Sequence, residues 1–278
     1  MTPAQVISCS RRTDIPRCYP GWLDEKLAAG GLTFKAPRGA VRSVSLSAEA
    51  VHSLVLWSKD YGPLFRRRLL IRRLHGFNPF FHFTITGLGE SAWESGIPGW
   101  KQTMLQMKEI VNEFGAARVN WRFDPVLFWR ENGRLRSNLP LFTRLGAAAA
   151  DLGITGCTFS FAHWYNKSQR RANRGGVPFA DPGPEEKLAA VRILADEAEG
   201  LGLRLASCSN DSWLAVPGIA KARCIDASLL GGLRDDGRPA STAKDRAQRA
   251  ACGCTRSIDI GSYAQRCPGA QCLYCYAN

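Results

Sequence analysis

The chain has 278 residues, of which 45% are hydrophobic and 22% are charged, and this composition argues against a disordered or fibrous protein. No apolar run approaches the roughly 18 residues that a membrane-spanning helix needs, and the sequence does not start with a basic segment followed by a long apolar one. We therefore expect a cytoplasmic protein without a membrane partner. The net charge of +13 favours a polyanionic partner such as nucleic acid, or a small anionic substrate.

Short β-rich segments alternate with helical patterns along most of the chain. The predicted helices cover residues 99–114, 141–152 and 184–201, and the last opens with a proline and two glutamates, which suit a helix start. The predicted strands are residues 5–10, 32–35, 52–58, 79–86, 117–123, 156–161 and 201–207, with a weaker eighth at 223–226.

Apolar strands that alternate with helices imply an α/β fold with a parallel sheet covered by helices. Seven or eight such units in about 230 residues favour a TIM-like (βα) barrel, complete or partial, over a doubly wound sheet. Loops are predicted at 170–184 and 231–244, where glycine, proline and charge are frequent. The second loop is expected to separate a barrel domain, residues 1–240, from a cysteine-rich tail, residues 241–278, which packs on the barrel mouth.

Polar side chains follow directly after several predicted strands, and in a barrel these positions share one rim where sites are built. Paired arginines suit carboxylate or phosphate groups, which favours an anionic substrate. A structural alternative is that Arg122 and Asp124 simply pair with each other, and that the arginine-rich segment 66–73 is the solvent-exposed face of a helix. The candidate catalytic residues at this rim are Arg11, Arg12, Asp14, Lys59, Arg122 and Asp124.

Five of the ten cysteines occur from position 252 onward, and in a cytoplasmic chain such crowding favours metal or redox chemistry over disulfides. Cys267, Cys272 and Cys275 have the spacing C-x4-C-x2-C, which allows one loop to hold three irons of a 4Fe-4S cluster. Zinc fits this pattern less well, because it typically takes four ligands from two separated C-x2-C pairs. The spacing therefore predicts an iron-sulfur site with one iron left open.

Four further cysteines form a looser set. Cys252 and Cys254 make a C-x-C pair, and together with Cys208 and Cys224 they offer four thiolates for a second iron-sulfur cluster or a zinc ion. Alternatively, one of them supplies the fourth ligand of the terminal cluster, or Cys208 is merely a small buried apolar residue. Core or incidental roles are expected for Cys9, Cys18 and Cys157.

The ending CLYCYAN, with aromatic Tyr274 before the last cysteine, resembles the cluster loop of radical S-adenosylmethionine enzymes, especially the spore photoproduct lyase branch. SRRTDIP, WRFDP, QRAACGC, SIDIGSY and this ending occur in the order of the domain of unknown function 1848 family, to which nearly the whole chain is similar. The resemblance implies a radical-enzyme-like barrel with its cluster motif at the C-terminus. The chain departs from the usual C-x3-C-x2-C spacing by one residue between Cys267 and Cys272.

This resemblance also implies S-adenosylmethionine as a cofactor, bound at the open iron of the cluster. Tyr274 and the stretch TGLGE, with Gly87, Gly89 and Glu90, are the counterparts of the segments that contact this cofactor in the family. The leading hypothesis is an enzyme that makes a 5'-deoxyadenosyl radical, acts on an anionic substrate and takes electrons from a donor such as flavodoxin or ferredoxin. The alternatives are a nucleic-acid-binding protein with a structural iron-sulfur or zinc site, and an electron-transfer module.

Overall fold

An eight-stranded sheet, in which neighbouring strands run parallel, organises the fold. The computed structural model describes residues 4–35, 41–269 and 271–277. The strand order follows the chain from β1 to β13, with β14 added beside β1. The strands from one edge to the other are β14 (Ile258–Asp259), β1 (Gln5–Cys9), β4 (Val51–Ser58), β5 (Pro79–Thr84), β7 (Val119–Val126), β10 (Gly156–Phe161), β12 (Arg204–Ser207) and β13 (Ile219–Lys221).

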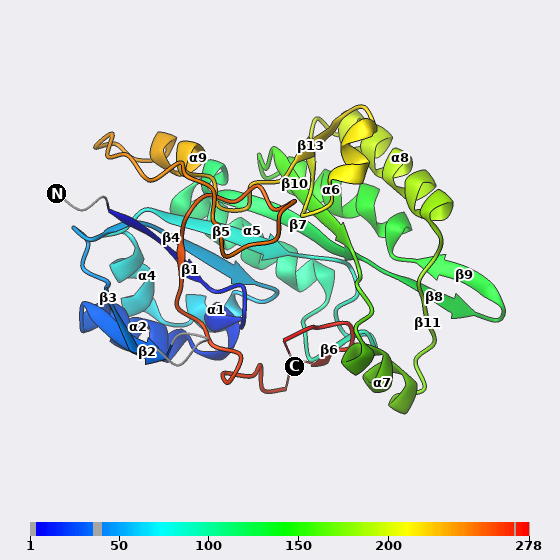
Figure 1. Ribbon diagram of the computed structural model, residues 1–278, viewed down its shortest axis with the longest axis horizontal. Helices are drawn as coiled ribbons and strands as arrows, with labels where there is room; N and C mark the ends of the chain where they lie inside the picture. Colours follow the sequence, from blue (N-terminus) through cyan, green and yellow to red (C-terminus); the bar gives the residue numbers. More distant parts are fainter. Residues whose placement is uncertain (1–3, 36–40, 270, 278) are drawn as a thin grey trace.

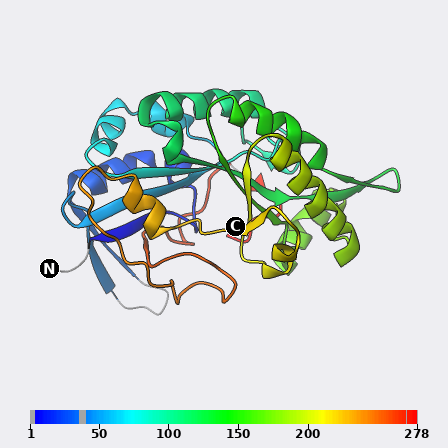
Figure 2. The same cartoon turned by 90° about the horizontal axis from the view of Figure 1, so that it is seen from above.

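Helices connect these strands and cover one side of the sheet. Figure 2 shows α5 (Trp100–Phe114), α6 (Phe142–Ala150) and α8 (Pro184–Gly200) along that side, and the orange segment after α9 (Ala227–Gly232) on the opposite side. Crossover helices are what parallel neighbours require, because a short turn cannot return the chain to the start of the next strand. The predicted α/β class with a parallel sheet is confirmed. The shorter helices are α1 (Ile15–Cys18), α2 (Pro20–Ala28), α3 (Gly62–Phe65), α4 (Arg68–Leu74) and α7 (Asn166–Arg174).

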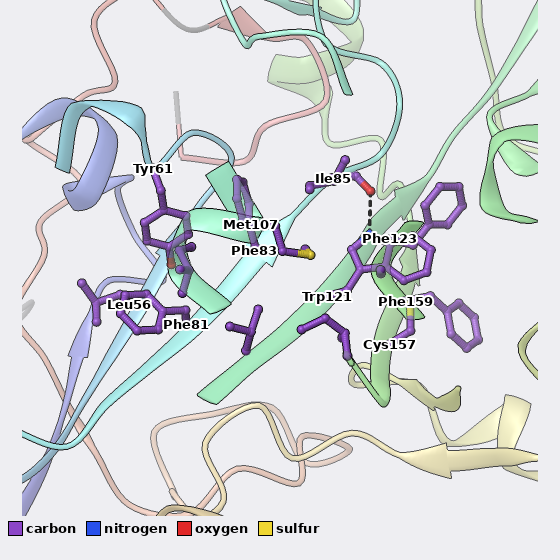
Figure 3. Close-up of a cluster of buried hydrophobic side chains, with 14 of the residues drawn as sticks. Leu56, Tyr61, Phe81, Phe83, Ile85, Met107, Trp121, Phe123, Cys157 and Phe159 are labelled. Carbon is purple, nitrogen blue, oxygen red and sulfur yellow. Dashed lines mark hydrogen bonds between the residues drawn. The ribbon is translucent and has the colours of Figure 1, made fainter. Parts of the chain in front are cut away.

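The two faces of the sheet differ in chemistry. Side chains alternate between faces along a strand, and in β7 Trp121 and Phe123 point toward the helices while Arg122 and Asp124 lie on the opposite face. We call the first the helix face and the second, which the C-terminal segment covers, the tail face. Figure 3 shows the aromatic packing of the helix face, where the indole Nε1 of Trp121 donates to the carbonyl of Ile85 at 3.0 Å.

Three small antiparallel sheets flank the main one. They pair β2 (Gly31–Lys35) with β3 (Val41–Ser45), β8 (Phe128–Glu131) with β9 (Arg134–Ser137) and β11 (Phe179–Ala180), and β6 (Glu94–Ser95) with β15 (Gln271–Cys272). The prediction that residues 32–35 form a unit of the main sheet is wrong, because β2 pairs with β3 in a separate two-stranded sheet.

Two other local predictions need correction. The eighth strand lies at β13, not at residues 223–226, since Asp226 caps α9 by accepting hydrogen bonds from the backbone of Ser228 and Leu229. The predicted loop 170–184 contains the end of α7 and the short strand β11.

The three predicted long helices are confirmed as α5, α6 and α8. The arginine-rich segment forms α4, whose Leu70, Ile71 and Leu74 are buried, so its solvent-exposed arginine face is also confirmed. Within the described ranges, no helix combines the length and apolar character needed to cross a membrane.

The C-terminal segment is tied to the main fold at two points. Strand β14 pairs with β1, with Ile7 opposite Ile258 and Ser8 opposite Asp259. Strand β15 pairs with β6, which lies in the connection after β5. Figure 1 shows the segment, coloured orange to red, running past β1 to β6 near the C-terminus. Residues at the end of the sequence therefore lie beside the carboxyl ends of the first strands of the sheet.

Candidate functional site

A polar network occupies the centre of the tail face. The indole of Trp57 stacks on the His82 ring with 4.1 Å between centroids and donates to Ser8 Oγ at 3.1 Å. His82 Nε2 donates to the carbonyl of Cys224 at 2.5 Å, and Asn120 Nδ2 lies 3.4 Å from His82 Nδ1. Burial lowers the pKa of His82 to about 3, with the positive charge of Arg122 acting in the same direction. His82 is therefore a neutral, fixed donor at ordinary pH.

Arg122 and Asp124 lie at the carboxyl end of β7, and their pairing is confirmed. Arg122 also donates through Nη1 to Cys224 Sγ at 3.0 Å, and its guanidinium lies over the Trp57 ring, 5.1 Å from the centroid. Ser160 donates to the other oxygen of Asp124. Burial opposes the negative charge of Asp124, but the Arg122 guanidinium and the Ser160 hydroxyl outweigh it and lower the pKa of Asp124. A charged pair is thus held beside a cysteine sulfur.

Lys59 and Glu94 form a second charged pair at the same rim. Their Nζ and Oε1 atoms are 2.9 Å apart, and the side chains are only 15% and 2% exposed. Thr86 and Tyr274 both donate to Glu94. Burial opposes the charge of Lys59, but attraction to Glu94, Cys272 and Asp124 raises its pKa above the ordinary value. Lys59 therefore stays cationic, and the negative charges of Cys272 and Asp124 contribute to this.

The cysteines predicted to bind the terminal cluster, Cys267, Cys272 and Cys275, are called the tail cysteines, and all three are half-buried. Cys267 accepts a hydrogen bond from the backbone N–H of Asp14 at 3.5 Å and lies 3.8 Å from Thr13 Oγ1. A hydrogen bond with Cys18 is the main reason why the pKa of Cys267 falls to about 6 despite partial burial. N–H donors that favour a thiolate also suit a metal-bound sulfur.

Cys272 and Cys275, the other two tail cysteines, follow Cys267 toward the end of the chain. Burial raises the pKa of Cys272, while the Lys59 ammonium favours its thiolate. The negative charges of Cys275 and Cys267 also act on Cys272, and the backbone N–H of Cys275 donates to the carbonyl of Cys272 at 2.9 Å. The guanidinium of Arg171 on α7 donates to the carbonyl of Cys275 and fixes the end of the loop.

The looser set predicted from sequence, Cys208, Cys224, Cys252 and Cys254, is called the inner cysteines. Cys208 follows β12 and Cys224 follows β13, whereas the C-x-C pair comes from the C-terminal segment. Cys224, Cys252 and Cys254 belong to one buried cluster, and Cys208 packs against it. The contact with Cys224 lowers the pKa of Cys208 to about 7, although burial opposes this. The structure brings all four together.

The first three candidate catalytic residues mainly anchor the chain. Asp14 accepts hydrogen bonds from Ser58 Oγ at 2.7 Å and from the backbone of Lys59 and Arg17 at 3.0 and 3.1 Å. Burial raises the pKa of Asp14 to about 7, although these donors oppose the shift. The carboxylate thus joins the start of α1 to the end of β4.

Arg11 and Arg12 contact the C-terminal segment. The backbone N–H of Arg11 donates to Asp259 at 2.8 Å, and its guanidinium lies 3.9 Å from Asp245. Arg12 donates to the carbonyl of Gly261 at 3.1 Å. Both arginines therefore hold the segment against β1, and Arg11 also lies over Trp57 at 5.6 Å.

The stretch predicted to contact S-adenosylmethionine is packed against its own chain. A Cβ at Gly89 would come within 2.1 Å of the Pro98 carbonyl oxygen, and one at Gly87, where φ is +78°, would come within 2.5 Å of Leu141. The backbone N–H of Glu90 donates to the carbonyl of Ile97 at 2.9 Å. Close packing alone accounts for both glycines.

An open cavity of about 770 Å³ lies next to the tail cysteines, between the start of α7 and the end of the chain. Its lining includes Trp164, Tyr165, Tyr263 and Tyr276, together with His163. The Tyr276 hydroxyl donates to the carbonyl of Arg11 at 2.5 Å, which connects this cavity to the rim. A cavity of about 470 Å³ between α3 and α5 contains none of the predicted site residues.

Both cysteine groups offer the thiolate donors that iron-sulfur clusters and zinc require. In the described part of the chain, no three Cys, His, Asp or Glu side chains are already arranged around one point as metal ligands. Binding at either group would therefore require side-chain rotation. The residues fit a thiophilic centre by their chemistry, their proximity and the N–H donors around them.

Sequence reasoning missed Cys18 and Glu94. Cys18, expected to be core or incidental, is hydrogen-bonded to Cys267, a residue far away in sequence. Glu94 is 2% exposed and accepts from Lys59, Thr86 and Tyr274. No local pattern marks either residue, because Cys267 and Tyr274 reach them only when the C-terminal segment folds back, and Lys59 reaches Glu94 only when β4 and β6 come together.

Comparison with known proteins adds one finding. No curated protein matches the chain. Residues 6–277 match the family described as Domain of unknown function (DUF1848), so the chain belongs to that family.

Proposed function

We propose that this protein is an iron-sulfur enzyme of the radical S-adenosylmethionine type, with its cluster held by Cys267, Cys272 and Cys275. The observation that carries the proposal is the position of the tail cysteines, which lie beside Lys59 and Asp14 at the carboxyl ends of β4 and β1. In parallel α/β sheets, ligands bind at these strand ends. When bound, the cluster would supply the electron, received from flavodoxin or ferredoxin, that cleaves S-adenosylmethionine.

The residues around the tail cysteines support an anionic substrate. Lys59 is cationic and buried, it pairs with Glu94, and the negative charge of Asp124 also acts on it. An incoming carboxylate or phosphate would compete with these carboxylates for its ammonium group, at a site where water is largely excluded. Tyr274 would orient Glu94 through its hydroxyl. The aromatic cavity at Tyr165, Tyr263 and Tyr276 is suited to stacking of the cofactor adenine or of a planar substrate.

We further infer that the main sheet is a partial (βα) barrel. Its strand order follows the chain from β1 to β13, as in a barrel, and helices lie along one side (Figure 2). Among the described residues, the edge strands β13 and β14 are not paired with each other. The tail cysteines would then lie at the mouth of this partial barrel, close to its open side.

The test is anaerobic reconstitution of the full chain with iron and sulfide. We expect about four irons per chain, and we expect reduction with dithionite in the presence of S-adenosylmethionine to yield 5'-deoxyadenosine and methionine. The triple variant Cys267→Ala, Cys272→Ala, Cys275→Ala should lose both properties. Cys157→Ala, a buried cysteine of the helix face, is the matched control and should keep them. Failure of the wild-type chain to yield 5'-deoxyadenosine would contradict the proposal.

One observation favours the electron-transfer alternative. Cys18 is hydrogen-bonded to Cys267, so a fourth thiol is available to the terminal cluster and would close its open iron. The electron paramagnetic spectrum of the reduced protein separates the two functions. A spectrum changed by S-adenosylmethionine supports the radical enzyme, whereas a spectrum that changes only in the Cys18→Ala variant supports a cluster with all four irons held by protein.

The nucleic-acid alternative receives less support from the arrangement of charge. The arginine-rich helices α4 and α7 lie at opposite ends of the molecule (Figure 1), so they do not form one continuous basic surface. On α7, Arg171 is engaged with the carbonyl of Cys275.

A further inference from the structure

The inner cysteines come from three separate parts of the chain and meet on the tail face. Cys224, Cys252 and Cys254 are 7%, 8% and 3% exposed, and Cys208 is half-buried. Cys224, Cys252 and Cys254 belong to one cluster of buried side chains, and Cys208 packs against it. Free cysteines often serve as small apolar core residues, but four from three segments in mutual contact form a donor set.

Backbone packing brings the C-x-C pair against the end of β13. A Cβ at Gly253 would come within 2.7 Å of the Ala222 carbonyl oxygen, so only glycine allows this approach between Cys252 and Cys254. The backbone of Thr255 donates to the carbonyl of Ile225 at 2.9 Å. The two segments are therefore held in register independently of the thiols.

Polar donors aimed at the sulfurs distinguish this group from apolar core packing. Arg122, which is 7% exposed, donates through Nη1 to Cys224 Sγ at 3.0 Å, and the backbone N–H of Ile225 donates to Cys254 Sγ at 3.4 Å. A buried guanidinium requires an acceptor, and a thiolate satisfies it better than a neutral thiol does. The positive charge of Arg11 also acts on Cys254.

We propose that Cys208, Cys224, Cys252 and Cys254 bind a single zinc ion in a structural site that is separate from the tail cysteines. A zinc ion holds each thiolate at about 2.3 Å, which places the sulfurs of a tetrahedron about 3.8 Å from one another. Cys224, Cys252 and Cys254 share one buried cluster with Cys208 packed against it, so side-chain rotation can bring all four thiolates to one ion. A cuboidal cluster, whose cysteines bind different irons, needs more space between them.

The site balances charge and ties the C-terminal segment to the sheet. Four thiolates and one zinc ion carry a net charge of about −2, which Arg122 and Arg11 offset from the sheet side. The ion joins the ends of β12 and β13 to the segment that continues into β14. Metal binding here stabilises the packing on which the position of the tail cysteines depends.

Metal analysis of the full chain, purified anaerobically, tests the zinc site independently of the proposed function. The triple alanine variant of the tail cysteines should retain about one zinc ion per chain and no iron. The double variant Cys224→Ala, Cys254→Ala should lose the zinc, and Cys157→Ala should keep it. A tail variant without zinc, or with about four irons, would overturn the proposal. Absence of iron in the wild-type chain would instead contradict only the proposed function.

A second measurement covers the case in which the double variant does not fold. In the wild-type chain, the inner cysteines should resist iodoacetamide and become alkylated after a zinc chelator is added, as peptide mapping would show. Cys157 is the internal control, and its labelling should not respond to the chelator. The proposal would be overturned if the inner cysteines were alkylated to the same extent with and without the chelator, or if two of them formed a disulfide.

Discussion

The two faces of the main sheet come from the same strands but serve opposite purposes. In β7, Trp121 and Phe123 are fully buried against the helices, whereas Arg122 and Asp124 pair on the tail face. The helix face is stabilised by apolar burial, which is tolerant of detail as long as volume is filled. The tail face contains charges and thiols whose stability depends on specific partners. The difference indicates that the helix face depends on apolar volume and the tail face on specific polar partners.

The largest expected effect is on the helix face. Trp121→Ala removes a fully buried indole and its hydrogen bond to the Ile85 carbonyl, and we expect it to lower the free energy of unfolding by about 4 kcal/mol. Chemical denaturation monitored by circular dichroism measures this. The control Leu105→Ala, at a side chain that is 58% exposed on α5, should change it by less than about 0.5 kcal/mol. An equal loss of unfolding free energy in the two variants would contradict the claim that apolar burial on the helix face stabilises the fold.

A smaller effect is expected from breaking the buried pair on the tail face. Arg122→Met leaves Asp124 without its cation and Cys224 without its donor, and it should cost about 3 kcal/mol of stability at pH 8. Its control is Arg136→Met, which breaks an exposed pair with Glu131 and should cost less than about 1 kcal/mol. Equilibrium urea unfolding compares the two, and a loss at Arg122 no larger than the control would show that the pair is dispensable.

The effect that is smallest per unit of the change made concerns pH. Because the pKa of folded His82 is about 3, below its ordinary value of 6.5, the unfolded chain binds a proton between these values that the folded chain does not. Stability should therefore fall with acidification from pH 6.5 toward pH 3, and His82 contributes at most about 1.4 kcal/mol per pH unit. In the His82→Phe variant, the part of the pH dependence of stability that comes from His82 should disappear. His75→Phe, at the exposed pair with Glu113, retains His82 and should retain the slope.

Much of the fold follows from local pattern. Apolar runs predicted six strands of the main sheet and its three long helices, because each element buries one face whatever its neighbours are. The prediction that residues 32–35 belong to the main sheet was wrong because the partner of a strand is decided by other segments. Here the following segment forms β3 and pairs with β2. The strand predicted at residues 223–226 is wrong because Asp226 caps a helix. Its sequence context does not distinguish this role from a strand end.

The candidate site was only partly predictable for the same reason. The close spacing of Cys267, Cys272 and Cys275 marks them without any structure, since one loop contains all three. Lys59, Arg122 and Asp124 were found because they follow strands, and their neighbours Glu94 and Cys18 were missed because their partners are distant in sequence.

The sequence by itself determined the alternation of apolar strands and helices, the DUF1848 motifs and the two sets of cysteines. Periodicity and spacing are local properties, and they survive without knowledge of the fold. Only the tertiary structure decided that Cys208, Cys224, Cys252 and Cys254 meet, that Cys18 contacts Cys267, and that Lys59 pairs with Glu94. The cysteine contacts arise because the C-terminal segment returns across the tail face and pairs with β1, a step that no local pattern specifies. The Lys59–Glu94 pair joins the end of β4 to β6, which no local pattern specifies either.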